Sequence, residues 1–234
     1  MTVNSLPAPP NQNHYTPERR GILFIISAPS GTGKTTLCKQ IAASLPGLWH
    51  SVSYTTRKPR PGEESGREYF FIEETVFQGM VERNEFMEYA QVYGNWYGTP
   101  RRTLMEKMEQ GVDVLLEIDV QGALQIKKKI DDAVYIFILP PSMDTLRSRL
   151  QSRASDSQEE ILRRLQKVKE EVWSVREYYY IVRNDDLAQS LRELQSIFLA
   201  ERLKTKRLDM NWLEQNFILE KETKPAARDI SSTQ

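Results

Sequence analysis

Apolar runs suited to buried strands alternate along the chain with stretches whose apolar residues recur at helical spacing. The helical periodicity is clearest over Thr35–Leu45 and Leu187–Leu203, where apolar residues line one side. Regular alternation of strand and helix predicts an α/β fold, in which a parallel sheet is flanked by helices. The strands of this sheet are expected at four continuous apolar runs, Ile22–Ile26, Val112–Ile118, Val134–Leu139 and Tyr179–Val182.

Two stretches interrupt this alternation. Residues 51–99 hold two short strand-like pieces, Ser51–Thr55 and Tyr69–Ile72, around a loop rich in glycine, proline and charge. This stretch predicts an inserted lobe of mixed α+β structure. Residues 146–178 are helical in pattern and rich in arginine, so we expect a helical lid there.

The two ends of the chain differ from its middle. Residues 1–20 carry prolines and almost nothing apolar, so we expect a disordered arm. Residues 209–234 combine a short helical pattern with a polar tail and are expected to form a C-terminal extension. The domain between them, 21–208, is predicted to consist of a core at 21–50, 100–145 and 179–208, the inserted lobe at 51–99 and the lid at 146–178.

Composition narrows the classes of function. Lys and Arg together number 32, as do Asp and Glu, so the net charge is zero, which excludes a globally basic nucleic-acid-binding protein. The single cysteine, Cys38, excludes an intramolecular disulfide and a cysteine zinc cluster. No apolar run approaches the roughly 20 residues of a membrane span, and the N-terminus has no apolar signal core. We therefore expect a cytoplasmic protein with no nucleic-acid or membrane partner.

The strongest motif is the segment SAPSGTGKTT, which follows the first apolar run and fits the phosphate-loop pattern. Its glycines allow successive backbone N–H groups to point inward, and the N-terminus of the next helix adds a partial positive charge. Lys34 can reach the β- and γ-phosphates of a nucleoside triphosphate, and the Thr35 hydroxyl can ligate Mg²⁺. The residues expected to bind the nucleotide are Ala28, Pro29, Ser30, Gly31, Thr32, Gly33, Lys34, Thr35 and Thr36.

The alternative interpretation of this motif is a glycine-rich turn with an exposed lysine. An apolar strand before it and an amphipathic helix after it favour the nucleotide site. Ala28 stands where the pattern has its first glycine, and a residue with a β-carbon prefers a negative φ. Either this position does not need a glycine conformation, or the loop differs slightly from the usual one.

The inserted lobe carries a second candidate phosphate site. Arg57 and Arg60 lie three residues apart, and guanidinium groups pair bidentately with the oxygens of a phosphate monoester. An isolated basic run is usually a solvated turn. Here the flanking strand pieces and the glycines at 62 and 66 favour a shaped loop. Further basic and hydroxyl side chains surround the two arginines, namely Lys58, Arg67, Ser53, Tyr54, Thr55, Thr56 and Tyr69.

Two carboxylates beyond this loop suit a guanine base. Glu88 can accept hydrogen bonds from a purine that carries both N1–H and an exocyclic amine, and adenine offers no such pair of donors. Asp119 comes after the Val112–Ile118 run. It therefore lies at the carboxyl end of a predicted parallel strand, where α/β sheets bind their ligands.

Taken together, these motifs resemble the guanylate kinase family from about Gly21 to Lys206. The family signature S-x-S-x-T-T-R-x-x-R-x-G-E-x-x-G-x-x-Y-x-F is filled at every fixed position from Ser51 to Phe71. The resemblance implies a P-loop kinase fold and an Mg²⁺-dependent transfer of the ATP γ-phosphate to GMP. It implies that the GMP phosphate binds to Ser53, Arg57, Arg60, Tyr69 and Tyr97, and that guanine binds to Glu88, Thr99 and Asp119.

The segment L-E-I-D-x-Q-G, Leu116 to Gly122, also matches the family. Glu117 stands where some relatives carry aspartate, and either carboxylate can hold a Mg²⁺-bound water. The resemblance therefore implies a metal site at Thr35 and Glu117, in which Thr35 comes from the phosphate loop.

The lid contributes arginines that suit a transferring phosphoryl group. Arg149 and Arg153 are four residues apart and share one helix face, while Arg164 follows on the next helix. From the residues alone, a surface helix with scattered charges is an equally good interpretation. The resemblance implies that Arg149 and Arg153 clamp the ATP phosphates, that Arg164 bridges both nucleotides, and that Asn184 lies near the adenine. The expected catalytic set is Lys34, Arg57, Arg149, Arg153 and Arg164.

Two rival functions stay open at this point. The first is a catalytically inactive guanylate-kinase-like module that binds phosphopeptides at the GMP-phosphate site. An intact phosphate loop and intact lid arginines argue against it. The second is a related kinase with another acceptor, such as AMP, UMP or a sugar phosphate, against which Glu88 and Asp119 argue. The expected partners are ATP and GMP, and the sequence is compatible with a monomer or a homo-oligomer.

Overall fold

The computed structural model describes residues 19–151 and 158–218, which belong to two units. The larger unit is Arg20–Lys204. The smaller unit combines the terminal segments and includes, among its described residues, a 3-10 turn at Thr205–Arg207, helix α8 (Met210–Leu213) and a π-helical turn at Glu214–Ile218. The predicted N-terminal arm lies outside the described residues except for its last two positions. No helix in the described ranges combines the length and the apolar character of a membrane span.

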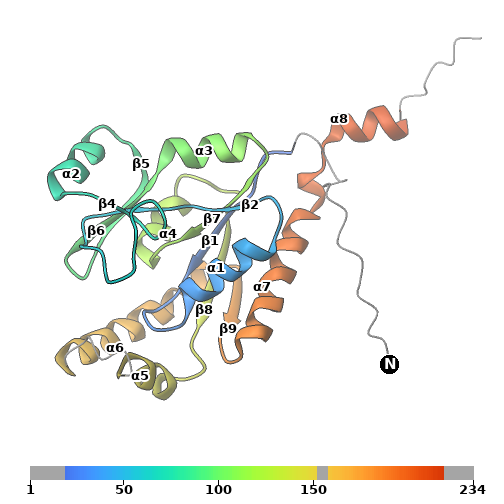
Figure 1. The fold of residues 1–234 in the computed structure, drawn as a ribbon. Coiled ribbons are helices and arrows are strands. Elements are labelled where there is room, and N and C mark those ends of the chain that lie inside the picture. The colour runs from blue at the N-terminus through green and yellow to red at the C-terminus, as the bar shows by residue number, and fades with distance from the viewer. Residues whose placement is uncertain (1–18, 152–157, 219–234) are drawn as a thin grey trace, which may run out of the picture. The chain divides into compact units, whose positions relative to one another are not determined.

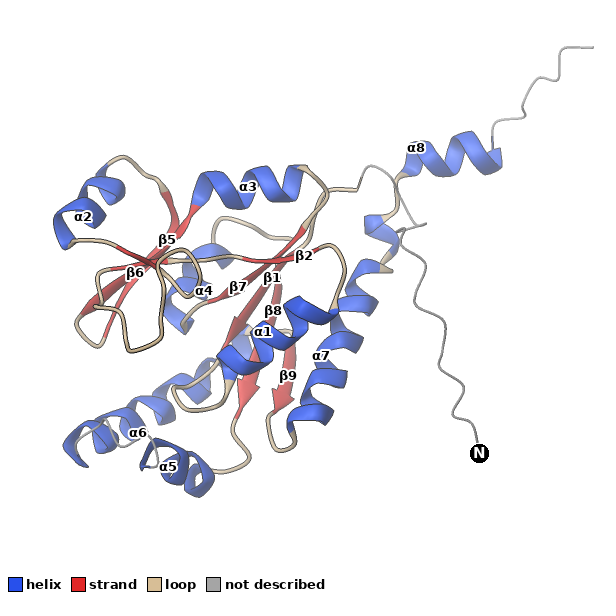
Figure 2. Cartoon of the chain, viewed as in Figure 1, coloured by secondary structure: helices blue, strands red, loops and turns tan. Residues whose placement is uncertain are grey.

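The larger unit is built on a five-stranded parallel sheet (Figures 1 and 2). Its strand order is β2-β7-β1-β8-β9, so the first long strand lies in the middle of the sheet. The central strands are buried on both faces, which is why they read as continuous apolar runs in the sequence. In spatial order the strands are β2 (Leu48–His50), β7 (Asp113–Glu117), β1 (Leu23–Ser27), β8 (Val134–Leu139) and β9 (Tyr180–Arg183).

Helices cover both faces of this sheet. Alternate residues of β1 point to opposite faces and pack against different helices. Leu23 and Ile25 pack with α3 (Arg101–Glu109) and α4 (Val120–Lys127). On the other face, Phe24 packs with α1 (Lys34–Ser44) and α7 (Leu187–Arg202), and its ring stacks on Phe198 of α7 with 3.9 Å between centroids. The predicted α/β fold is confirmed, and the helices on the two faces hold the strand ends rigidly in place.

The inserted lobe has its own four-stranded sheet, ordered β4-β3-β6-β5. The lobe also has its own small core of Phe77, Met80 and Phe86. Its elements are β3 (Tyr54–Thr55), β4 (Phe70–Phe71), α2 (Glu74–Glu82), β5 (Phe86–Val92) and β6 (Asn95–Pro100).

The lid consists of α5 (Met143–Gln151) and α6 (Gln158–Trp173), followed by a 3-10 turn at Ser174–Glu177. The two helices bury a cluster of leucine, isoleucine and valine side chains between them. Arg164 of α6 is also buried, with 8% of its surface exposed. Arg153 lies outside the described residues.

Candidate functional site

The phosphate loop connects β1 to α1 at the carboxyl edge of the sheet. Gly31 and Gly33 have φ of 91° and 89°, so the loop uses the left-handed conformation that its glycines allow. Among the described residues only Asn84 and Tyr93 are non-glycine residues with positive φ, so Ala28 keeps an ordinary backbone conformation. The first loop position therefore does not need glycine in this protein.

Asn184, which directly follows β9, hydrogen-bonds to the phosphate loop. Its Nδ2 donates a hydrogen bond of 2.6 Å to the carbonyl of Thr32, and the side chain is buried. A β-carbon at position 33 would lie only 2.5 Å from that Nδ2. Asn184 and Gly33 are therefore matched, and the asparagine fixes the loop's shape.

Two side chains of the loop face the end of β7. Lys34 donates through Nζ to the carbonyl of Ile118 at 3.0 Å. Thr35 Oγ1 donates to Glu117 Oε1 at 2.5 Å. On the other side of that carboxylate, His50 Nε2 lies 3.7 Å from Oε2, and burial lowers the pKa of this histidine. An ammonium, a hydroxyl and a carboxylate thus meet beside the loop's N–H groups.

The lobe holds the predicted GMP-phosphate residues around a single arginine. The Arg57 guanidinium lies 5.4 Å from the centroid of Tyr69 and 5.6 Å from that of Phe71. The Tyr97 ring lies 5.7 Å from that of Tyr69. Burial raises the pKa of Tyr69, so its phenol stays neutral and can donate a hydrogen bond. Ser53 is half-buried just before β3, while Arg60 is exposed.

The Glu63 carboxylate connects the Arg57 side chain to the backbone of Arg60. One of its carboxylate oxygens accepts from Arg57 Nη2 at 3.0 Å, and the other accepts from the backbone N–H of Arg60 at 2.8 Å. Burial acts to raise the pKa of Glu63, but these hydrogen bonds outweigh it and lower the pKa. A charged carboxylate therefore ties both arginines of the signature to one turn.

Glu88 and Thr99 form the other end of the lobe site. They are cross-strand partners on β5 and β6, and Thr99 Oγ1 donates to Glu88 Oε1 at 2.5 Å. Glu88 is 3% exposed, and this burial raises its pKa to about 7. Asp119 lies opposite as the N-cap of α4, where Oδ1 accepts from the Gly122 N–H at 2.9 Å.

Gly122 lets the two carboxylates approach each other. A β-carbon on it would lie 2.3 Å from Glu88 Oε2 and 3.4 Å from Asp119 Oδ1. No other residue type fits there without displacing the Glu88 carboxylate. The glycine of the L-E-I-D-x-Q-G segment therefore leaves the space that the Glu88 carboxylate occupies.

The lid arginines reach the phosphate loop. Arg149 donates to the carbonyls of Thr32 and Asn184, at 3.4 Å each. Arg164 Nη1 lies 3.5 Å from Ser30 Oγ. Two separate lid helices thus bring guanidinium groups to the same loop.

This geometry agrees with comparisons to known proteins. The sequence profile of the guanylate kinase family matches residues 20–201. The chain belongs to the guanylate kinase family. The guanylate kinase of Geobacter metallireducens is 51% identical over 191 residues, which cover 82% of this chain and 94% of that protein. That of Carboxydothermus hydrogenoformans is 43% identical over 202 residues, covering 86% and 99%.

A solved guanylate kinase has the same fold. The crystal structure of the enzyme from Anaplasma phagocytophilum superposes with a TM-score of 0.73 at 33% identity, covering 87% of this chain and 98% of that one. The family resemblance and the P-loop kinase fold expected from the sequence are confirmed.

The residues that sequence reasoning missed in this guanylate kinase family member are Glu63 and Gly122. Both are fixed letters of the motifs that carry the resemblance, so the signal was present in the sequence. Their tasks depend on contacts to Arg57 and Glu88, which only the folded lobe brings about.

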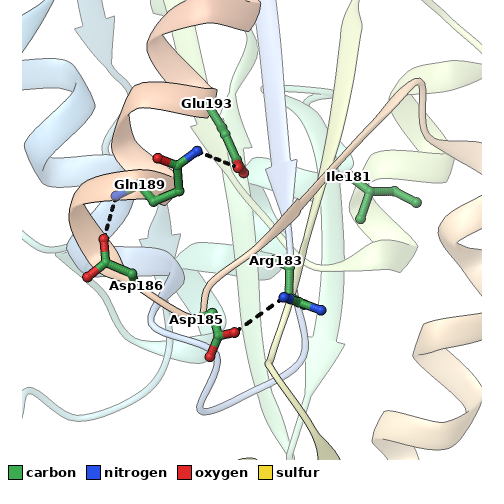
Figure 3. Close-up of a pocket in the computed structure, with 6 residues that line it drawn as sticks. All are labelled: Ile181, Arg183, Asp185, Asp186, Gln189 and Glu193. Atoms are coloured by element: carbon green, nitrogen blue, oxygen red, sulfur yellow. Dashed lines mark hydrogen bonds and ion pairs between the residues drawn. The ribbon is translucent and has the colours of Figure 1, made fainter.

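Two cavities lie near the end of β9. The larger, about 670 Å³, runs along β9 and the start of α7 (Figure 3), but its polar side chains are paired within its own wall: Arg183 with Asp185, and Gln189 with Glu193. The smaller, about 370 Å³, is lined by Gly31, Gly33, Thr36, Arg149, Asn184, Asp185 and Leu187. The smaller cavity thus combines glycines of the phosphate loop with a lid arginine.

Proposed function

We propose that this member of the guanylate kinase family catalyses the Mg²⁺-dependent transfer of the ATP γ-phosphoryl group to GMP, giving ADP and GDP. The observation that carries the proposal is the buried Glu88–Thr99 pair facing Asp119. A buried carboxylate without a cation against it is costly, and a guanine edge with two N–H donors would satisfy it.

The ATP phosphates bind to the backbone of residues 28–36 in this proposal. The left-handed glycines and the N-terminus of α1 support it, because both direct N–H groups at an anion. Lys34 needs only to leave the Ile118 carbonyl to reach the β- and γ-phosphates. Asn184, which was expected near the adenine, supports the loop and lines the smaller cavity, to which we assign the nucleotide.

The oxygen donors beside the loop fit Mg²⁺. Thr35 Oγ1 and Glu117 Oε1 are close enough to share one ligand sphere, and both are hard oxygens of the kind that Mg²⁺ prefers. When bound, Mg²⁺ would neutralise negative charge on the phosphate groups. We propose that Thr35 and Glu117 hold it, directly or through a bound water.

GMP binds in the lobe, with its phosphate against Ser53, Arg57, Arg60, Tyr69 and Tyr97. The close packing of Arg57 against two aromatic rings supports this assignment, because it presents the guanidinium as a fixed fork. The guanine would bind to Glu88, Thr99 and Asp119. The lobe thereby aims the GMP phosphate at the end of the ATP chain.

Catalysis then consists of positioning and charge neutralisation. A phosphate oxygen of GMP forms a bond to Pγ while the bond from Pγ to the bridging oxygen breaks, and that electron pair leaves with ADP. Positive charge around Pγ stabilises this transition state. We assign that charge to Lys34, Arg57, Arg149, Arg153 and Arg164.

We further propose that the catalytic domain is 21–208, with the lobe at 51–99 and the lid at 146–178. The family match over 20–201 supports these limits. The cytoplasm is the compartment that we propose, where the buried free thiol of Cys38 stays reduced.

The experiment is an ADP-release assay with Mg·ATP and GMP, AMP, UMP or CMP as acceptor. It compares the wild type with Glu88→Gln and with Glu106→Gln, a control whose carboxylate pairs with Arg102 on the exposed face of α3. We expect turnover with GMP alone, unchanged in the control and at least tenfold lower in kcat/KM for Glu88→Gln. GMP binding without turnover by any acceptor would favour the phosphopeptide-binding module instead, and turnover with another acceptor would favour the related kinase.

A further inference from the structure

Tyr93 occupies a strained position in the lobe. Strands β5 and β6 pair as far as Val92 and Asn95, so Tyr93 and Gly94 alone form the turn between them. Their φ values, 49° and 81°, are both positive, as a type I′ turn requires. Asparagine is the favoured residue at the first position of such a turn, and a bulky aromatic residue there is an outlier. Strain of this kind persists where the residue has another task.

The Tyr93 ring faces three cations of the lid helix α6. Arg163, Arg164 and Lys167 lie 5.4, 5.2 and 4.8 Å from its centroid. Arg163 and Arg164 are neighbours, and Lys167 follows four and three residues later, so the three lie within about one turn of the helix and form one patch. Their charges repel one another, and the negative face of an aromatic ring offsets that repulsion.

Arg164 continues this contact to the ATP side. It is buried, and its Nη1 approaches Ser30 Oγ in the phosphate loop at 3.5 Å. Tyr93 of the lobe, Arg164 of the lid and Ser30 of the core therefore form one line of contacts across three parts of the domain.

We propose that Tyr93 is a positioning residue that latches the lid to the lobe and couples the binding of the two nucleotides. This inference rests on the proposed function. A contact between α6 and the lobe hairpin favours the arrangement in which the lid lies against the lobe, and ligands that both prefer this arrangement then bind cooperatively. The partner that Tyr93 recognises is the cationic face of α6.

The test compares Tyr93→Leu, which removes the ring face, with Tyr93→Phe, which keeps it. The matched control is Tyr179→Leu, because Tyr179 also faces a cation, Lys127 at 5.5 Å, but lies directly before β9, outside the lobe and the lid. Calorimetry measures the Kd of ADP with and without GMP. We expect GMP to tighten ADP binding in the wild type, in Tyr93→Phe and in the control, and about tenfold less in Tyr93→Leu.

A third variant separates the loss of the Tyr93 contact from a loss of stability. Tyr93→Gly relieves the positive φ, so we expect its Tm to be at least that of the wild type while its coupling falls as in Tyr93→Leu. Full coupling in Tyr93→Leu would overturn the latch, as would equal losses in Tyr93→Phe and Tyr93→Leu.

A distance measurement keeps this result independent of turnover. Cysteines introduced as Glu82→Cys on α2 and Glu170→Cys on α6 are exposed and can carry a dye pair, whereas Cys38 is buried. Without nucleotide, we expect a larger lid–lobe distance in Tyr93→Leu than in Tyr93→Phe. If GMP is not phosphorylated but this difference appears, the proposed function fails and the latch stands. Equal distances in an active enzyme would overturn the latch alone.

Discussion

The roles of Glu88 and Gly122 follow from their buried surroundings rather than from their residue type. Glu88 is a surface-type residue placed inside the lobe, where a low dielectric favours its neutral form. Gly122 is conformationally ordinary within a helix, yet the space around it admits no side chain. Glu88 carries the buried carboxylate, and Gly122 leaves the space that this carboxylate occupies.

The raised pKa of Glu88 predicts a pH dependence of GMP binding. The guanine N–H donors need the ionised carboxylate, and its pKa of about 7 in the folded protein means that this form is lost as the pH falls below 7. We expect the KM for GMP to fall several-fold between pH 6 and pH 8, with a smaller change in the KM for ATP. A KM for GMP that is constant over this range would contradict the assignment of Glu88 to the base site.

The same pKa has an opposite effect on stability. Glu88 binds its proton more tightly in the folded state than in the unfolded chain, so its contribution to stability is present below pH 4.5 and is lost as the pH rises through 7. Glu88→Gln should therefore raise the Tm relative to the wild type at pH 8 more than at pH 5, measured by thermal unfolding without ligands.

Gly122→Ala should damage the base site while favouring the helix. A β-carbon 2.3 Å from Glu88 Oε2 must displace the carboxylate, so we expect the KM for GMP to rise at least tenfold. The control is Gly79→Ala in α2, where the nearest atom is the flexible end of Arg83 at 3.1 Å. Both changes gain up to about 1 kcal/mol of helix propensity. Steady-state kinetics measures the KM for GMP of the two variants. Equal values would refute a steric role of Gly122.

At the scale of elements, each of the two loops that we assign to phosphates is held in shape by a single polar side chain. Asn184 of the β9–α7 connection fixes the phosphate loop, and Glu63 fixes the turn that carries Arg57 and Arg60. The elements themselves follow the sequence pattern: the four predicted core strands lie within two residues of β1, β7, β8 and β9. Strand β2 was not predicted, because three residues at a sheet edge give no periodicity.

Glu63→Gln should loosen the arginine turn. The amide keeps an acceptor for the Arg60 N–H but loses the charge that pairs with Arg57, and hydrogen bonds to charged groups contribute about 1.5–3 kcal/mol. We expect the KM for GMP to rise about tenfold with a smaller change in kcat. Glu64→Gln, next along the chain and paired at the surface with Arg67, is the control. Tighter GMP binding in Glu63→Gln would mean that the carboxylate competes with the GMP phosphate.

At the scale of the whole domain, the last long helix closes the sheet through a buried ion pair. Asp113 at the start of β7 is 0% exposed, and its carboxylate accepts from Arg202 Nε at 2.7 Å and from the N–H of Ile22 at 2.8 Å. Arg202 also donates to the carbonyl of Pro46 at 2.9 Å. The end of α7 is thus tied to β1, β7 and the α1–β2 connection.

Arg202→Met should therefore destabilise the whole domain. It removes the Arg202 guanidinium from the buried Asp113 carboxylate, and breaking a buried ion pair in this way typically costs about 3–5 kcal/mol. In urea unfolding, the midpoint concentration should fall while the m-value, the slope of the unfolding free energy against urea, stays unchanged. Arg192→Met, on the exposed side of α7, serves as the control. A loss below about 1 kcal/mol would mean that the other contacts of Asp113 satisfy its carboxylate.

The sequence by itself determined the alternating α/β core, the phosphate loop, the arginine signature and the family, because these depend on local periodicity and on residues close together in the chain. Only the tertiary structure decided which distant groups meet. Glu88 and Gly122, Arg57 and Glu63, and Tyr93 and the lid cations are brought together by the lobe sheet, its turns and the packing of α6. The physical reason is that a pKa, a steric limit or a latch belongs to a pair of neighbours in space, and sequence spacing does not specify those pairs.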